Sequence, residues 1–334
     1  MTVTINQVAA EAGVSITTVS RVLNNNYPVR KETREKVEAT IKRLNYKPNI
    51  MARGLITKKT SVIGVVVPGI TNLFFSTIVE SIENYLRASR YNIFLCNTAG
   101  EEEYKSVIDD IIARQVDGII IIDPLINEDS NEFYENLNSS IPTIIINGDT
   151  SERNYNRVAY DEKSGAEEAF NYIYELGHER VLFIRGRQSL SYDIKEKVYR
   201  EMAPKHGYCE ILTVGGGNSI EVVEKTRMKF SRFIEEIGTP DAVFACNDLM
   251  ALGVLNACIE KNISVPEQIS ITGFDNTMIS DITKPKITTV DQNMELVAKT
   301  ASEALLNKIK NKSNEKVNVI LPTKLVCKES CMKR

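Results

Sequence analysis

The chain has few of the side chains on which catalytic and metal sites are usually built. Among its 334 residues there are only two histidines, His178 and His206, and each lies beside a glycine at a predicted helix exit. Neither belongs to a recognisable triad or metal cluster. The six cysteines form no C-x-x-C pair, which suits a reducing compartment. The sequence therefore predicts no catalytic site and no metal site.

Long hydrophobic runs and phosphate-binding loops are also missing. No apolar stretch approaches the length of a membrane span, and the polar N-terminus is unlike a signal peptide, so we expect a cytoplasmic protein. Three glycines at 215–217 follow a predicted strand, but they have neither G-x-G-x-x-G nor P-loop spacing and indicate a flexible turn. We therefore expect no cofactor.

Charge is distributed very unevenly along the chain. Residues 1–60 contain 11 basic and 4 acidic side chains, a net charge of +7, whereas residues 61–334 carry a net charge of −10. A basic head on an acidic body predicts that the head binds a polyanion. The alternative of an anionic membrane surface lacks an amphipathic basic helix with bulky apolar anchors.

Residues 3–24 predict two short helices joined by a tight turn. Asn6 is the expected N-cap of the first helix, Gly13 supplies the backbone freedom for the reversal, and Ser15 caps the second helix. Apolar side chains at helical spacing are expected to face inward: Val8, Ala9, Ala12, Val19, Val22 and Leu23. A helical hairpin with a merely solvated face is the alternative.

The outer face of the second helix carries side chains that can read DNA. Arg21 can bond guanine acceptors, Asn24 can pair with adenine or a phosphate, and the methyl groups of Ile16 and Thr17 suit thymine. The predicted DNA contacts of this helix are Ser15, Ile16, Thr17, Thr18, Ser20, Arg21 and Asn24. A third helix at about 31–44 is expected to close the core of this headpiece.

These residues resemble, nearly position for position, the headpiece of the lactose repressor family of bacterial transcription regulators. The resemblance implies a headpiece at 1–47 and, at 48–60, a hinge helix that orders on operator DNA and pairs with a second subunit. Asn49 and Arg53 are expected to contact DNA, and Leu55 stands where the family inserts a leucine into the minor groove. An ordinary apolar residue at a domain boundary is the alternative for Leu55.

Replacement of Leu55 tests the predicted hinge. The free-energy cost of partly unstacking a base step is offset by contacts between the protein and the bent duplex. Those contacts form only on the operator. We expect Leu55→Ala to weaken operator binding more than binding to random duplex. An equal loss on both DNAs, measured by gel shift, would count against the hinge assignment.

The body, residues 61–334, predicts two α/β lobes because short apolar runs alternate with helical segments. Helices are expected at about 77–89, 104–114 and 294–310, and the final two strands are expected to form a pair. The predicted strands are 62–67, 91–96, 117–122, 142–146, 181–184, 210–213, 242–245, 269–272, 287–290, 317–321 and 325–328.

The resemblance extends over nearly the whole body and sets its expected division. In the family the chain crosses between lobes three times, here near Asp161, Asp291 and Pro322. Lobe 1 is then about 61–160 and 291–321, and lobe 2 about 162–290 and 322–334. The expected fold class is an all-α helix-turn-helix headpiece with a hinge helix, followed by a two-lobed body that resembles periplasmic binding proteins, with doubly wound parallel sheets.

The family resemblance also implies an effector site between the lobes. Aromatic faces there would stack on a sugar or base, and amides and a carboxylate would bond hydroxyl groups. Phe74 and Phe75 could instead be core residues, and Asn247 could simply cap a helix. The positions carried over are Asn72, Phe74, Phe75, Asn147, Lys195, Asn247 and Asp275.

The helix after Gly186 departs from the family pattern. Lys195 stands where many members have an effector-binding arginine, and Val198 stands where they have glycine, so bidentate recognition is lost there. Lysine at this position also occurs in catabolite control proteins, whose corepressor is a serine-phosphorylated phosphocarrier protein. Those relatives carry a basic residue where this chain has Glu303, which argues against that partner. The effector is left open.

Together these features predict a dimeric, ligand-responsive repressor of carbohydrate or related metabolic genes that binds a near-palindromic operator. The expected partners are operator DNA, a second copy of the chain and a sugar-like effector. One alternative is a cytosolic small-molecule binding protein. Another is a catabolite-control regulator that responds to a phosphocarrier protein.

Overall fold

A computed structural model shows the fold of the chain. It describes residues 3–24, 27–47, 59–98, 101–124, 130–187, 189–216, 219–311 and 315–334. These form two compact units, 1–60 and 61–334. The predicted hinge residues Asn49, Arg53 and Leu55 lie outside the described residues. None of the helices in the described ranges is long and apolar enough to span a membrane.

The N-terminal unit contains three helices around a small apolar core. They are α1 (Ile5–Ala12), α2 (Ile16–Asn24) and α3 (Lys31–Arg43). Gly13 ends α1 in the left-handed region, at φ 61°, as the predicted reversal requires. The fully buried side chains of this unit are Val8, Ala9, Ala12, Val19, Val22 and Val37. The predicted inward faces of the first two helices and the predicted third helix are therefore confirmed.

The first helix begins two residues earlier than predicted. Thr4, not Asn6, is its N-cap: the Thr4 hydroxyl accepts from the Gln7 amide at 3.4 Å, and the Gln7 side chain accepts from the Thr4 amide at 2.8 Å. This reciprocal pair satisfies two amide donors that would otherwise have no partner, and Asn6 can satisfy neither from inside the first turn.

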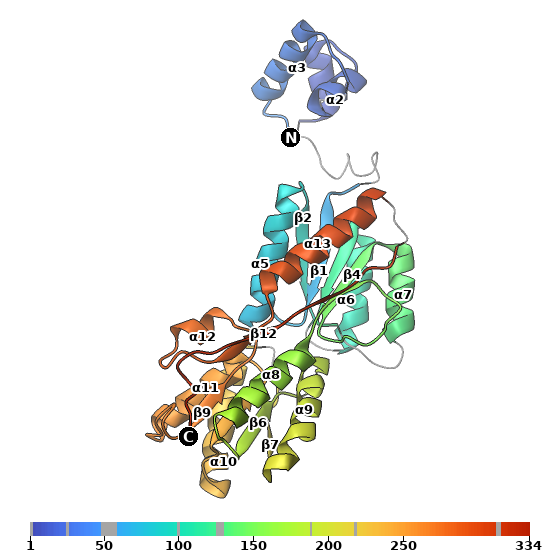
Figure 1. The fold of residues 1–334 in the computed structure, drawn as a ribbon. Coiled ribbons are helices and arrows are strands. Elements are labelled where there is room, and N and C mark those ends of the chain that lie inside the picture. The colour runs from blue at the N-terminus through green and yellow to red at the C-terminus, as the bar shows by residue number, and fades with distance from the viewer. Residues whose placement is uncertain are drawn as a thin grey trace. The chain divides into compact units, whose positions relative to one another are not determined.

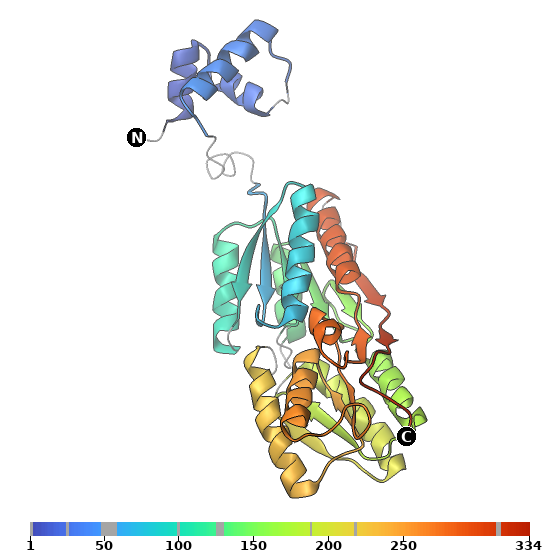
Figure 2. The ribbon, with the colours of Figure 1, turned by 90° about the vertical axis from the view of Figure 1, so that its left-hand side faces the viewer.

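The first lobe of the body is a six-stranded sheet in the order β11-β5-β4-β3-β1-β2, with every pair parallel. Alternate side chains of β1 (Val62–Val67) face opposite layers: Val65 packs with α5 (Leu73–Ala88) and α13 (Met294–Asn311), and Val66 packs with α6 (Glu101–Ala113) and α7 (Ser130–Ser140). Figures 1 and 2 show α5 and α13 side by side. The remaining strands are β2 (Asn92–Asn97), β3 (Gly118–Ile122), β4 (Thr143–Asn147), β5 (Arg157–Tyr160) and β11 (Asn318–Leu321).

The second lobe has a four-stranded parallel sheet in the order β7-β6-β8-β9. Helices α8 and α9 pack against each other, as do α10 and α11, and Figure 2 shows the two pairs on different sides of the strands. The strands are β6 (Val181–Arg185), β7 (Ile211–Thr213), β8 (Ala242–Ala245) and β9 (Ser270–Thr272). The helices are α8 (Glu162–Glu175), α9 (Leu190–Met202), the 3-10 helix η1 (Ala203–His206), α10 (Glu221–Ile237), α11 (Asp248–Glu260) and α12 (Met278–Ile282).

The predicted pairing of the last two strands is wrong. Strand β11 adds to the edge of the first sheet beside β5, whereas β12 (Lys324–Val326) pairs antiparallel with β10 (Thr289–Asp291). Strand β5 itself escaped the sequence analysis because it is short and begins with a charged residue. Arg157 is nevertheless buried, since its guanidinium donates to the Asn318 side chain at 2.7 Å and to the Asp149 carbonyl at 2.8 Å.

Candidate functional site

The second helix of the N-terminal unit presents an outward polar face. Val19 and Val22 are buried, while Ile16, Thr17 and Arg21 are exposed; Ile16, an apolar side chain, is 48% exposed. The exposed Ile16 side chain on this face can contact an apolar base edge.

Several predicted DNA contacts in this helix also have structural roles. The Ser15 hydroxyl accepts from the Thr18 amide at 3.2 Å and lies 2.9 Å from the Thr18 hydroxyl, so these two residues form the start of the helix. Ser20 is half-buried, and the side chain of Asn24 lies outside the described part of the chain.

The Arg21 guanidinium lies over the ring of Tyr27, 5.2 Å from its centroid. Tyr27 is 61% exposed, so the pair sits at the surface of the unit. The ring restricts the arginine by a cation–π contact without using any of its donors. Tyr27 was not predicted from the sequence as a contact of Arg21. The feature that could have indicated it is an aromatic residue just after the second helix.

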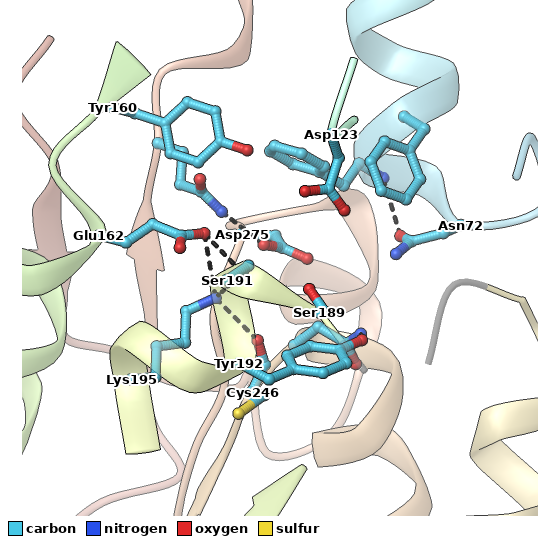
Figure 3. A pocket seen from close by; sticks show the side chains of 14 residues that line it. Asn72, Asp123, Tyr160, Glu162, Ser189, Ser191, Tyr192, Lys195, Cys246 and Asp275 are labelled. Carbon is cyan, nitrogen blue, oxygen red and sulfur yellow. Dashed lines mark hydrogen bonds and ion pairs between the residues drawn. The ribbon is translucent and has the colours of Figure 1, made fainter. Parts of the chain in front are cut away.

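The body contains a small cavity between its two sheets, at the carboxyl ends of their strands (Figure 3). Asn72 follows β1, Asp123 follows β3, Tyr160 ends β5, Asn247 follows β8 and Asp275 follows β9. The cavity measures about 20 Å³, which is space for about one water molecule. Ligands of open α/β folds bind at this edge of the sheet, so the position fits an effector site while the volume indicates a closed one.

Six of the seven predicted effector residues line this cavity. They are Asn72, Phe74, Phe75, Lys195, Asn247 and Asp275. The seventh, Asn147, ends β4 and is buried, but it is not among the cavity-lining residues. The next residue, Gly148, packs against the Glu162 carboxyl group. A Cβ at Gly148 would lie 2.4 Å from the Glu162 carboxyl carbon, so this close approach requires glycine.

The two asparagines that line the cavity also cap helices. The Asn72 side chain accepts from the Phe74 amide at 3.0 Å, and the Asn247 side chain accepts from the Met250 amide at 2.9 Å. The capping alternative for Asn247 is therefore confirmed. In each case the carbonyl oxygen accepts at the helix start, and the Asn247 amide NH₂ donates to the Tyr192 hydroxyl at 3.4 Å.

Lys195 is buried in the cavity wall by a network of its neighbours. Its Nζ donates to Glu162 Oε1 at 3.3 Å, to Ser191 Oγ at 2.8 Å and to the Cys246 carbonyl at 3.4 Å (Figure 3). The ammonium also lies 3.8 Å from the centroid of the Phe274 ring. Burial alone would lower the pKa of Lys195, but Glu162 and the other acidic neighbours raise it, so the ammonium stays charged.

Two further carboxyl groups at the cavity have perturbed pKa values. Burial, together with the nearby Glu162 charge, raises the pKa of Asp123 to about 7. Burial also raises the pKa of Asp275 well above its usual range, although Gln292 donates to it at 2.6 Å. Both aspartates have positive φ angles, 46° and 108°, a backbone strain that is concentrated at functional sites in proteins.

More than half of the residues that line the cavity were not predicted from the sequence. A signal existed for Asp123 and Glu162, because each is an acid within two residues of a strand end. Cys246 and Gln292 also directly follow strands, β8 and β10, but neither side chain carries a charge that would mark it as a site residue. The missed lining residues are Asp123, Tyr160, Glu162, Ser189, Ser191, Tyr192, Cys246 and Gln292.

Comparisons with known proteins agree with this architecture. Residues 4–49 match the family described as "Bacterial regulatory proteins, lacI family", and residues 170–331 match "Periplasmic binding protein-like domain". The chain is 34% identical over 340 residues to catabolite control protein A of Priestia megaterium, covering 99% of both chains. It is 33% identical over 330 residues to catabolite control protein A of Staphylococcus epidermidis, covering 97% of this chain and 98% of that one.

Solved structures extend the likeness to the whole fold. The lac repressor dimer bound to operator and the anti-inducer ONPF matches with a TM-score of 0.87 and 27% identity, over 99% of this chain and 100% of that one. The transcriptional regulator CelR in complex with cellobiose matches with a TM-score of 0.70 and 25% identity, over 98% and 99% of the two chains.

A helix-turn-helix unit joined to a two-lobed body with a cavity at its strand ends defines a DNA-binding transcription regulator with a ligand-binding body. The chain belongs to the lacI family of bacterial regulatory proteins. The predicted family and fold class are thus confirmed.

Proposed function

We propose that this protein is a dimeric repressor of carbohydrate or related metabolic genes. Its affinity for a near-palindromic operator is controlled by a small ligand that binds in the cavity of the body. The observation that carries the proposal is the pairing of an exposed reading face on α2 with an effector-type cavity in a separate compact unit. The likeness to a repressor dimer on operator and to a cellobiose complex supports it.

Each part of the chain has a proposed role. Residues 1–47 read the operator half-site, and residues 48–60 form the hinge. Lobe 1, at about 61–160 and 291–321, passes the state of the cavity to the hinge, and lobe 2, at about 162–290 and 322–334, holds most of the ligand contacts. The protein acts in the cytoplasm, where its DNA partner is found, and it acts by binding rather than by catalysis.

The coupling needs only a difference in ligand affinity between two arrangements of the lobes. A cavity of about 20 Å³ cannot admit a sugar-sized molecule, so a ligand would bind to a more open arrangement. A bound ligand would therefore shift the equilibrium between the closed and open arrangements of the lobes, and this shift would change the affinity for the operator.

A catabolite-control mechanism, with a phosphorylated protein as corepressor, is the second candidate because the curated relatives carry that name. One residue favours the small-ligand proposal. Glu303 on α13 accepts a hydrogen bond from the Tyr85 hydroxyl at 2.6 Å, and the family resemblance implies that catabolite control proteins carry a basic residue at this position. A carboxylate there would repel a phosphate group rather than bind it.

A salt-dependent gel shift tests the proposed function. A palindrome selected from random DNA is expected to bind at least about a thousandfold more tightly than random duplex. Affinity for both should fall as salt rises, because the basic headpiece releases counterions from phosphates. Equal affinity for both DNAs at every salt concentration would instead support a small-molecule binding protein with an ancillary headpiece.

A further inference from the structure

The charges that line the cavity do not balance. Three carboxyl groups face it, those of Asp123, Glu162 and Asp275, and Lys195 is the one basic residue among the lining residues that the structure describes (Figure 3). Lys195 is already engaged by Glu162 and Ser191. Two aspartates and Glu162 therefore share the charge of one cation among the described lining residues, and only Glu162 is in direct contact with it.

Unsatisfied hydrogen-bonding atoms show what the cavity needs. Gln292 is 1% exposed and uses its NH₂ group on Asp275, while its carbonyl oxygen is buried without a partner in the described part of the chain. Glu162 is also 1% exposed, and its second carboxylate oxygen is likewise without a partner there. Both atoms are acceptors, so a molecule that supplies hydrogen-bond donors would satisfy them.

The lining residues suit an organic cation better than a metal ion. Within the described ranges no three His, Cys, Asp or Glu side chains are grouped so that they could hold a metal. The lining is instead partly aromatic, with Phe74, Phe75 and Tyr160 in edge-to-face contact at 5.3 and 5.9 Å between ring centroids. Aromatic rings beside carboxylates are a recurrent environment for ammonium groups.

The chain already holds one ammonium group in this environment. Lys195 is bound by a carboxylate, a hydroxyl, a carbonyl oxygen and the face of Phe274. Burial raises the pKa of Asp123 to about 7 and raises that of Asp275 well above its usual range, and the Lys195 charge offsets only part of either shift.

We propose that the effector of this protein is a small organic cation, a molecule that carries a primary ammonium group on a compact polar scaffold. Its ammonium group would be bound by Asp123 and Asp275, and its carbon frame would lie against Phe74 and Phe75. This inference rests on the proposed role of the cavity as the effector site, and it narrows the ligand from sugar-like molecules in general to cationic ones.

Calorimetric titration with matched probes tests the inference. Two amines are each compared with a neutral partner of the same frame: glucosamine with glucose, and putrescine with 1,4-butanediol. At least one amine is expected to bind about tenfold or more tightly than its neutral partner, because a charge-assisted hydrogen bond is lost in the neutral one. Equal binding within each pair, or binding by neither amine, overturns the proposal.

A carboxylate variant locates the binding. Asp123→Asn keeps the size of the side chain and removes its charge, and it is expected to weaken amine binding about tenfold more than it weakens binding of the neutral partner. Asp109→Asn removes an exposed carboxylate of α6 on the same lobe and serves as the matched control, with no expected change. An identical loss in both variants contradicts the assignment.

Gel shifts on the same samples separate this inference from the proposed function. Selective operator binding together with tight glucose binding would overturn the cationic ligand and leave the sugar-responsive repressor standing. Amine binding without any preference for a selected palindrome would overturn the repressor and leave the cationic site standing.

Discussion

Lys195→Met is expected to lower the free energy of unfolding of the body by about 3–5 kcal/mol, the usual cost of removing one partner of a buried ion pair. Lys195 and Glu162 are each 1% exposed, so water cannot replace the lost ammonium. The Glu162 carboxylate would remain buried near Asp123 and Asp275 with no opposite charge. Calorimetric melting of the full chain should show a drop of about 2–4 °C per kcal/mol.

A second variant separates charge from packing. Glu162→Gln combined with Lys195→Met removes both charges while keeping both side-chain volumes, and it should recover most of the loss because no unpaired charge remains. Lys163→Met is the control: it breaks an exposed pair with Glu167 on the same helix and should change stability by less than about 0.5 kcal/mol. If the double variant is no more stable than Lys195→Met, the ion pair is not the cause.

Arg21→Ala is expected to weaken binding to a selected palindrome by about 1–3 kcal/mol, or roughly 5- to 150-fold, and to broaden the preference at the base it reads. The guanidinium is held over Tyr27 at the surface of the headpiece with its donors available to a base edge. Binding to random duplex should fall much less, since that binding depends on total charge. Competition gel shifts with both DNAs give the two affinities.

Two further substitutions sharpen this result. Arg21→Lys keeps the charge but loses the planar fork, so it should lose specific binding almost as Arg21→Ala does. Lys42→Ala removes an exposed charge from α3 and should leave the ratio of specific to random binding unchanged. A constant ratio in all three variants would mean that Arg21 contacts phosphate and does not read a base.

The headpiece shows what local sequence can predict and where it fails. Its helices were predictable because Gly13, the cap at Ser15 and the apolar spacing all act within a few residues. The first cap was assigned wrongly to Asn6 because Thr4 and Asn6, on either side of Ile5, are both residue types that cap helices. Thr4 is the cap because Gln7, three residues later, completes a reciprocal pair that Asn6 cannot make.

Strand partners depended on contacts that no local pattern encodes. The runs that form β1, β3 and β4 were evident because parallel strands buried on both faces are continuously apolar. The separate partners of β11 and β12 were missed, because two neighbouring strands of similar composition give no sign that they join different sheets. Burial of Arg157 was also unpredictable, since one of its partners, Asn318, is 161 positions away along the chain.

By itself, the sequence determined a basic helix-turn-helix head, an acidic α/β body and membership of one regulatory family, because charge, helix spacing and apolar runs are properties of neighbouring residues. Only the tertiary structure decided the chemistry of the cavity. Lys195 is neutralised by Glu162, 33 positions away, and Asp275 is bound by Gln292, 17 positions away. Such pairs form because folding brings together segments that are separated along the sequence, and burial then makes each charge depend on its nearest partner.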